Sequence, residues 1–228
     1  FPFIKTEMKY KDPNGYMGSL YCSTVAMSAN AMNLVCNYSG ILYTSTDGGL
    51  TWTSRAIAGN RSWGGVGISD NGMTIVAFVQ GSYIFRSLDG GVSWSACTAA
   101  GLHNWTAIRI SSDGTKIFAA TNGDYIAKSV NSGASWATCT TAGNKIWTSL
   151  SLSADGSIIF ASASPTYPSL STDGGASWTE LVNNPGGGNT DQTVVSGDGT
   201  HLFCGFSGRF YRSDDMGQNW VQISNLSN

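Results

Sequence analysis

The sequence predicts an all-β fold, a five-bladed β-propeller with four antiparallel strands in each blade. The first observation behind this prediction is an eight-residue stretch, Ser45 to Trp52, which we call the octapeptide loop and which comes back four more times. Its copies begin at Ser87, Ser129, Ser171 and Ser213, and they end on Trp52, Trp94, Trp136, Trp178 and Trp220, each 42 residues after the one before. The second observation is that short β-branched and apolar runs alternate with turn-forming Asp and Gly within every repeat. Four short strands in a repeat of this size are typical of one propeller blade.

The third repeat gives the expected order of elements within a blade. Strands are expected at 105–110, 116–120, 125–128 and 135–139, with turns at 112–114 and 121–124 and the octapeptide loop before the last strand. The other repeats keep this order. The first turn recurs at Ser69, Ser153 and Ser196, and in the first repeat, at Ser28, Ala31 replaces the glycine that such a turn favours. We therefore expect that first turn to be looser.

The N-terminal segment, residues 1–20, precedes the propeller, which is expected over 21–228. Tyr10 lies 42 residues before Trp52, so residues 7–12 stand in the register of a fourth strand and offer a possible extra outer strand. A closed ring then has six candidates for five outer positions, and we favour 220–224 for the last position because it carries the loop tryptophan. The N-terminal strand could instead close the ring as a clasp, pair with another molecule in self-assembly, or lie along its own propeller, and the chain could be an excerpt of a longer array.

Composition limits the possible partners. Only 11% of the residues are charged and the formal net charge is -2, which argues against nucleic acid or an anionic membrane surface as a partner. No apolar run approaches the roughly 18 residues of a membrane span, so membrane insertion is not expected. A hydrophobic content of 41% with eight tryptophans is enough for a folded core.

The cysteines and histidines do not form a metal-ligand pattern. Five cysteines cannot all pair with one another, no CxxC occurs, and we interpret the cysteines mostly as small buried hydrophobes. His103 and His201 stand alone. No metal site and no cofactor is predicted.

Four N-x-S/T sequons make candidate glycosylation sites, at Asn37, Asn60, Asn104 and Asn225. Their number is what chance gives for a chain rich in Asn, Ser and Thr, so the count alone argues nothing. The polar, charge-poor composition nevertheless favours an extracellular or cell-surface location. The chain begins at Phe1, which fits a processed chain or an excerpt.

The octapeptide loop resembles the Asp-box, or BNR repeat, of the sialidase-like propeller superfamily, with the pattern S-x-D-x-G-x-T-W. The resemblance covers about residues 21–224 and implies a structural turn between third and fourth strands, far from the ligand face. In physical terms the acid accepts turn amides, glycine allows the backbone conformation and tryptophan plugs the turn. The residues given this structural role are Asp47, Trp52, Asp89, Trp94, Asn131, Trp136, Asp173, Trp178, Asp215 and Trp220. Asn131 and Ser132 depart from the pattern in the third loop and Met216 and Asn219 in the fifth, and we expect both turns to survive.

Catalysis is not predicted. Sialidases resemble one another in an arginine triad, an Arg-Ile-Pro motif and six blades, whereas this chain lacks Arg-Ile-Pro. Its arginines do not recur at places that would line one channel: Arg55, Arg61, Arg86, Arg109, Arg209 and Arg212. A glycoside hydrolase needs two nearby carboxylates, and only Asp124 and Asp191 are expected on one face outside the regular turns, from non-adjacent segments.

A ligand is expected on the face opposite the octapeptide loops, where aromatic residues recur beside Asn and a basic residue. The candidate binding residues are Tyr21, Trp63, Trp105, Trp147, Arg61, His103 and Lys145. Aromatic rings with amides nearby suit sugar stacking, whereas the same rings could equally be core wedges between blades. The two interpretations differ in the exposure of the indole rings.

The sequence therefore predicts a non-catalytic extracellular interaction or scaffolding module, part of a larger assembly, which binds protein partners or glycans. The alternative is a multivalent lectin that uses Trp63, Trp105 and Trp147. A glycoside hydrolase is the third possibility.

Overall fold

The computed structural model describes residues 7–11, 17–186, 190 and 192–223, and the side chains of residues 7–11 and 17–21 lie outside this description. The described chain is almost entirely strands and turns. Its elements are β1 (Glu7–Lys11), β2 (Met17–Tyr21), β3 (Thr24–Met27), β4 (Leu34–Tyr38), β5 (Ile41–Ser45), β6 (Thr53–Ser54), β7 (Trp63–Ile68), β8 (Ile75–Val79), β9 (Ile84–Ser87), β10 (Ser95–Ala96), β11 (Trp105–Ile110), β12 (Ile117–Asp124), β13 (Ala127–Ser129), β14 (Ala137–Thr138), β15 (Lys145–Leu152), β16 (Ile159–Ser164), β17 (Ser169–Ser171), β18 (Thr179–Glu180), β19 (Gln192–Val195), β20 (Leu202–Phe206), β21 (Arg209–Ser213) and β22 (Val221–Ile223). Three short 3₁₀ turns, Ala56–Ala58, Thr98–Ala100 and Thr140–Ala142, follow β6, β10 and β14.

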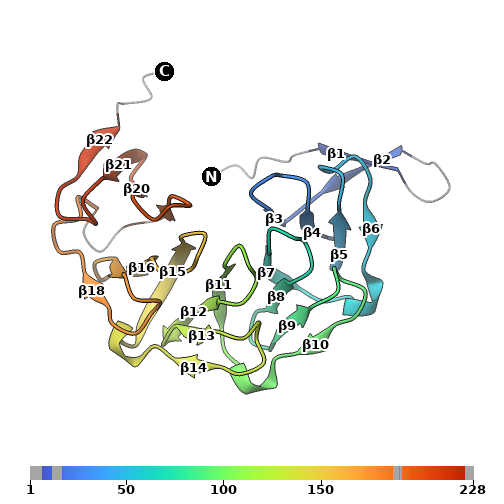
Figure 1. The fold of residues 1–228 in the computed structure, drawn as a ribbon, viewed down its shortest axis with the longest axis horizontal. Coiled ribbons are helices and arrows are strands. Elements are labelled where there is room, and N and C mark those ends of the chain that lie inside the picture. Colours follow the sequence, from blue (N-terminus) through green and yellow to red (C-terminus); the bar gives the residue numbers. More distant parts are fainter. Residues whose placement is uncertain (1–6, 12–16, 187–189, 191, 224–228) are drawn as a thin grey trace.

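Consecutive strands pair antiparallel in sets of four. β3–β6, β7–β10 and β19–β22 are separate four-stranded sheets, whereas β11–β14 and β15–β18 are joined into one eight-stranded sheet. The join arises because β12 continues through 121–124, where a turn was predicted, and pairs Asn122 with Ile146 and Asp124 with Lys145. Figure 1 shows these sets following one another around a common centre, with first strands inside and fourth strands outside.

The fourth strands are shorter than predicted. In the third repeat a strand was expected over 135–139, but β14 contains only Ala137 and Thr138. The chain then turns through the 3₁₀ segment Thr140–Ala142. Gly143, at a positive φ of 83° that glycine adopts readily, ends this segment and leads into β15.

The first hairpin turn forms in spite of its missing glycine. Ser28 Oγ donates to Asn30 Oδ1 at 2.7 Å, as Ser69 Oγ does to Asn71 Oδ1 in the next repeat. Ala31 takes the place of Gly72 and has a φ of 56°. The expectation of a looser turn was wrong, since the turn keeps its hydrogen bonds and holds alanine in a left-handed conformation instead.

The core lies between neighbouring sheets. One cluster packs Phe118 and Ile126 of one sheet against Leu150 and Ile159 of the next, and all four side chains are fully buried. Successive inner strands contact one another from β3 through β7, β11 and β15 to β19. The burial of apolar side chains between sheets therefore stabilises the whole array.

The strands at the two ends of the chain pair within their own ends of the fold. β22 pairs with β21 as the outer strand of the last sheet, which is the arrangement the sequence favoured. β1 pairs with β2 in a separate hairpin, in which Glu7 lies opposite Tyr21. The sequence interpretation assumed that the last sheet lies beside the first, whereas the sheets form an arc with these two at opposite ends (Figure 1).

Candidate functional site

The octapeptide loops are closed hydrogen-bond networks. In the first loop Ser45 Oγ donates to Asp47 Oδ1 at 2.7 Å and accepts from the amide of Gly49 at 2.8 Å. Asp47 also accepts from the amide and the hydroxyl of Thr51, and Trp52 Nε1 donates to the carbonyl of Gly49. These bonds, those from the Thr51 side chain foremost, lower the pKa of Asp47 to about 2. Both carboxylate oxygens of Asp47 therefore accept hydrogen bonds from residues of the same loop.

The loops that depart from the pattern keep the same network. Asn131 Oδ1 accepts from the amide of Ser135 at 2.8 Å, and its Nδ2 donates to Ser135 Oγ. In the fifth loop Asp215 accepts from the amide and the side chain of Asn219. Both turns survive, as expected. Ser132 and Met216, which replace glycine, have φ values of 54° and 56°.

The predicted stacking tryptophans are core residues. Trp63, Trp105 and Trp147 are 4%, 1% and 0% exposed. The indole of Trp63 donates to the carbonyl of Gly40 at 3.0 Å and that of Trp105 to the carbonyl of Ser82 at 2.8 Å. A sugar in solvent cannot reach these ring faces, so the interpretation of the rings as wedges between sheets is correct and stacking on them is not. The side chain of Tyr21 lies outside the described residues.

The three basic candidates beside these tryptophans have partners within the chain. The Arg61 guanidinium lies 4.4 Å from the centre of the Phe85 ring. His103 Nδ1 lies 3.0 Å from Asp124 Oδ2. Lys145 pairs with Glu180 and lies 5.2 Å from the centre of the Trp147 ring. Each of these side chains therefore has a contact within the chain, with an aromatic ring for Arg61, with a carboxylate for His103 and with both for Lys145.

Two of the sequons are exposed and one is not. Asn60 and Asn104 are exposed on the connectors before Trp63 and Trp105. Asn37 is only 6% exposed, and its Nδ2 donates to Ser23 Oγ at 2.7 Å, so a glycan on Asn37 cannot fit the folded chain. Asn225 lies outside the described residues.

A hollow of about 240 Å³ lies at the centre of the array, where inner strands from every part of the arc meet. Its lining combines small or polar residues with apolar ones. The small or polar residues are Thr24, Gly64, Gly65, Thr106, Ala107, Thr148, Ser149 and Gln192, and the apolar ones are Val25, Val66, Phe78 and Ile108. Among the described residues that line this hollow, Arg109 on β11 is the one with a charge. The equivalent position is Gly67 on β7 and Ser151 on β15. We call this hollow the central channel.

Arg109 is a cation without an acidic partner among the described side chains. Its side chain is open to water in the channel, while the surrounding sheets remove much of its hydration and this burial lowers its pKa. Nη1 donates to its neighbour's carbonyl, that of Ile108, at 2.8 Å. Thr106 Oγ1, in the same lining, is buried without a hydrogen-bond partner in the described part of the chain. The channel thus offers donors that suit an anionic or carbonyl group.

Sequence reasoning set Arg109 aside because the six arginines do not recur from repeat to repeat. The signal that could have found it is the contrast at one repeat position, since the arginine on this innermost strand corresponds to residues as small as Gly67 and Ser151 on the neighbouring inner strands.

A second hollow, of about 270 Å³, lies on the connector face beside the His103–Asp124 pair. Its lining includes Gly81, Asn104 and Asn122. Of the two acids considered for catalysis, Asp124 is paired with His103 and Asp191 lies outside the described residues.

Within the described ranges, no group of three or more His, Cys, Asp or Glu side chains could hold a metal ion. The helical segments found there are 3₁₀ turns, and none is long and apolar enough to cross a membrane.

Comparison with known proteins gives the fold. No protein-family model matches the sequence, and no curated protein matches it. A GH74 enzyme of Niastella koreensis has a similar structure, with a TM-score of 0.71 and 21% identity over 90% of this chain and 31% of that one. YCF48 bound to a D1 peptide has a TM-score of 0.65 and 19% identity over 88% of this chain and 68% of that one. An ancestral GH74 enzyme has a TM-score of 0.65 and 17% identity over 89% and 32%.

This chain therefore spans about a third of the length of the GH74 enzymes that it matches. At these identities the likeness concerns the fold alone. Together with the all-β sheets of four antiparallel strands, it shows that the chain has a β-propeller fold.

Proposed function

We propose that this chain is a non-catalytic interaction module that binds a carboxylate-bearing protein segment in the central channel. The single observation that carries this proposal is Arg109, a cation without an acidic partner among the described side chains, in a channel whose other described lining residues are uncharged. An arginine is well suited to bind a carboxylate, because the guanidinium fork matches the two carboxylate oxygens.

Two further observations support a binding role. YCF48, whose structure is similar, is bound to a peptide of D1. A non-catalytic role is supported by the described acids of the octapeptide loops, which accept hydrogen bonds within their own turns, and by Asp124, which pairs with His103.

Binding of short peptides to the 228-residue chain tests this function. A panel of acidic peptides with a free C-terminal carboxylate is compared with the same peptides carrying a C-terminal amide, by calorimetry at low salt. Arg109→Ala is expected to weaken binding at least about tenfold, since a charge-assisted hydrogen bond contributes roughly 1.5–3 kcal/mol, and Arg109→Lys to weaken it less. Arg209→Ala, which removes an exposed arginine at the start of β21, is the matched control. Equal binding of both peptide forms, unaffected by Arg109→Ala, would contradict the proposal.

Finer features of the module belong to the same proposal. We infer five blades, one for each 42-residue repeat, and an Asp-box identity for the octapeptide loops, supported by their hydrogen bonds. The extracellular location is supported by the charge-poor composition and the exposed sequons at Asn60 and Asn104. A mass loss after glycosidase treatment of the protein from a secreting eukaryotic host tests both sequons. Self-assembly through the N-terminal strand stays a prediction.

Glycan binding is the second candidate, and the polar hollow beside His103 and Asn104 favours it. This form of the hypothesis uses amide and hydroxyl groups rather than the buried tryptophans. A glycan array separates the two functions, since the peptide module should give no signal on it. A glycan at Asn104 would cover this hollow and remove the second candidate.

A further inference from the structure

Each joint between neighbouring sheets has an apolar part made of the same positions. The earlier sheet contributes Phe118 and Ile126, or their equivalents, and the later sheet contributes Leu150 and its equivalents. At the earlier-sheet position of Ile126, Leu42 and Ile84 are likewise 0% exposed. At the later-sheet position of Leu150, Val66 and Ile108 are 4% and 1% exposed. A joint therefore needs two different faces, one from each sheet.

Two of the joints also have a polar part. A basic side chain of the earlier sheet reaches the octapeptide loop of the later one: Arg86 Nη1 donates to the carbonyl of Ser132 at 2.6 Å. Lys128 Nζ donates to the carbonyl of Gly175 at 3.0 Å in the next joint. The cation thus ties the later loop down through backbone oxygens that the loop itself does not use.

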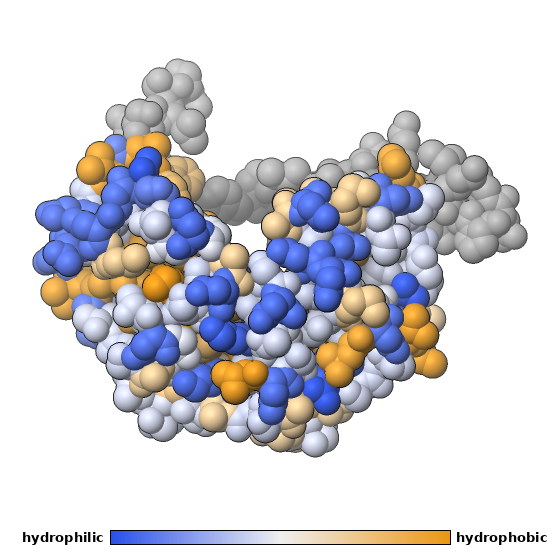
Figure 2. Space-filling model, viewed as in Figure 1, coloured by the Kyte–Doolittle hydropathy of each residue, from blue (hydrophilic) through white to orange (hydrophobic). Residues whose placement is uncertain are grey.

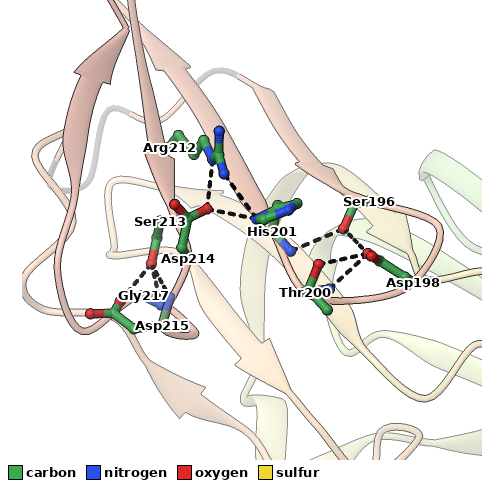
Figure 3. Close-up of polar contacts among 9 residues, drawn as sticks. All are labelled: Ser196, Asp198, Thr200, His201, Arg212, Ser213, Asp214, Asp215 and Gly217. Atoms are coloured by element: carbon green, nitrogen blue, oxygen red, sulfur yellow. Dashed lines mark hydrogen bonds and ion pairs between the residues drawn. The ribbon is translucent and has the colours of Figure 1, made fainter.

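The last sheet presents the earlier half of a joint without a later sheet on it. Phe210 stands at the position of Leu42, Ile84 and Ile126 but is 43% exposed. Phe203 stands at the position of the fully buried Phe118 and Phe160 and is partly exposed. Arg212 stands at the position of Arg86 and Lys128. With no later loop to reach, it lies against Asp214, 2.5 Å from its Oδ1, and 3.5 Å from His201 Nδ1 (Figure 3).

The first sheet presents the later half of a joint without an earlier sheet on it. Val25 is 55% exposed at the position of Val66 and Ile108, and Met27 is 64% exposed at the position of Ile68, which is 7% exposed. The octapeptide loop of the first sheet, Ser45 to Trp52, also differs from later loops, because in the described part of the chain no basic side chain of an earlier sheet lies against its second glycine, Gly49. A Cβ at Gly133 would meet Arg86 and one at Gly175 would meet Lys128, whereas one at Gly49 would meet only Trp52 of the same loop. In Figure 2 an opening separates the two end sheets, and apolar surface is visible over the last one.

We propose that a second copy of this chain docks head to tail on the first, with the last sheet of one copy packed against the first sheet of the other. The occupant follows from the complementarity of the two ends. Phe203 and Phe210 stand at positions that inner sheets bury against their successors, and Arg212 stands where Arg86 and Lys128 stand in two of those sheets. The face of Val25, Met27 and the first octapeptide loop is the kind offered to a predecessor. In the new joint Arg212 leaves Asp214 and donates to a backbone carbonyl of the loop at Ser45–Trp52 of the other copy.

The geometry of this contact sets the form of the assembly. The two patches differ, so the contact is heterologous, and copies add in series unless their rotation closes a ring. The proposed contact does not involve β1, because β1 pairs with β2 of its own chain. These exposed apolar faces are expected to drive association, because docking would remove apolar side chains from water as each joint between inner sheets does.

Sedimentation velocity of the 228-residue chain over a wide concentration range tests the proposal. The average mass is expected to rise above the monomer value of 24.0 kDa with concentration. The double variant Val25→Ser, Met27→Ser blocks the first sheet, and Phe210→Ser blocks the last. Each variant alone should have a self-affinity at least about tenfold weaker than that of the unmodified chain. A mixture of the two should form a 1:1 dimer through the one joint left intact. Val130→Ser, at a residue 62% exposed in an octapeptide loop and outside both faces, is the control and should associate like the unmodified chain.

The remaining outcomes overturn the proposal. An unmodified chain that stays monomeric at every concentration would show that no second copy covers these faces. Association that survives both blocking variants would place the contact elsewhere. Arg212→Ala gives an independent reading, since its side chain is half-exposed and its removal should weaken association without a change in the circular dichroism of the monomer. Association unchanged by Arg212→Ala would remove the polar part of the joint.

Discussion

Arg86 on β9 donates a hydrogen bond from Nη1 to the carbonyl oxygen of Ser132, which lies 46 residues further along the chain in the octapeptide loop of the next sheet, at 2.6 Å. This contact links two neighbouring sheets through a charged donor in a partly buried place. Arg86→Ala is expected to lower the free energy of unfolding by about 1–2 kcal/mol, because a charged donor makes a stronger hydrogen bond than a neutral one. Urea unfolding measures the loss. Arg209→Ala, at an exposed arginine, is the control and should change little; equal losses in both variants would show that the link is not stabilising.

Ala31 in the first hairpin turn gives the opposite kind of prediction. Its φ of 56° is costly for a residue with a Cβ, and glycine occupies the equivalent positions at Gly72 and Gly114. Ala31→Gly should therefore stabilise the protein by about 0.5–1 kcal/mol, the strain relieved being partly offset by the greater freedom of glycine in the unfolded chain. Thermal unfolding followed by circular dichroism measures the gain. Ala96→Gly, at an exposed alanine in β10, should destabilise, and a loss in both variants would contradict the assigned strain.

The sequence predicted the local features of each repeat but not the features that depend on contacts between repeats. The interval between Trp52 and Trp94 located the loops and hence the strand order, since a turn sequence is a local property. The burial of Trp63 and the openness of Arg109 depend on which side chains the neighbouring sheets bring up, and these come from other repeats. The open arc was not predicted either, because the repeat period fixes the content of one sheet but leaves the angle between successive sheets undetermined.

The octapeptide carboxylates make stability depend on pH in acid. Hydrogen bonds from the side chain two residues after the second glycine, and from turn amides, lower the pKa of Asp47 and Asp89 to about 2. In the unfolded chain an aspartate has a pKa of about 3.9. A lowered folded pKa gives stability that is fully present above pH 4 and is lost as the pH falls toward 2. The melting temperature should accordingly drop over this window. Asp89→Asn, which copies Asn131, should fold with a shallower drop; a melting temperature constant from pH 5 to 2 would contradict the assignment.

Two buried tryptophans form a matched pair for testing the connector positions. Trp105 and Trp147 occupy equivalent places and are almost fully buried, but only the indole of Trp105 has a hydrogen-bond partner, the carbonyl of Ser82, within the described residues. Replacing either by Phe removes similar apolar area. Trp105→Phe also removes a hydrogen bond, so it should cost about 1 kcal/mol more than Trp147→Phe. Chemical unfolding of both variants measures the difference, and equal costs would show that the hydrogen bond adds nothing.

The thiols of Cys22 and Cys36 form a hydrogen-bonded pair in which the two pKa values shift in opposite directions. Cys36 is fully buried and Cys22, which is half-buried, packs against it. The hydrogen bond from Cys36 lowers the pKa of the Cys22 thiol, and the same bond together with burial raises that of Cys36. Burial also raises the pKa of Cys139 and Cys204 to about 11. The interpretation of the cysteines as small buried hydrophobes thus fits four of the five, and Cys22 differs from them in both access and ionisation.

Because the thiolate is the reactive form, iodoacetamide should label Cys22 before any other cysteine of the native protein. Peptide mass mapping over time at neutral pH measures the order of labelling. Cys36→Ala removes the hydrogen bond and should slow labelling of Cys22, since its pKa then returns toward the ordinary value and less thiolate is present. Cys97→Ala, which empties a similar volume in a different cluster, should leave the rate at Cys22 unchanged. Labelling of Cys139 or Cys204 ahead of Cys22 in folded protein would show that access, rather than the thiol pair, governs reactivity here.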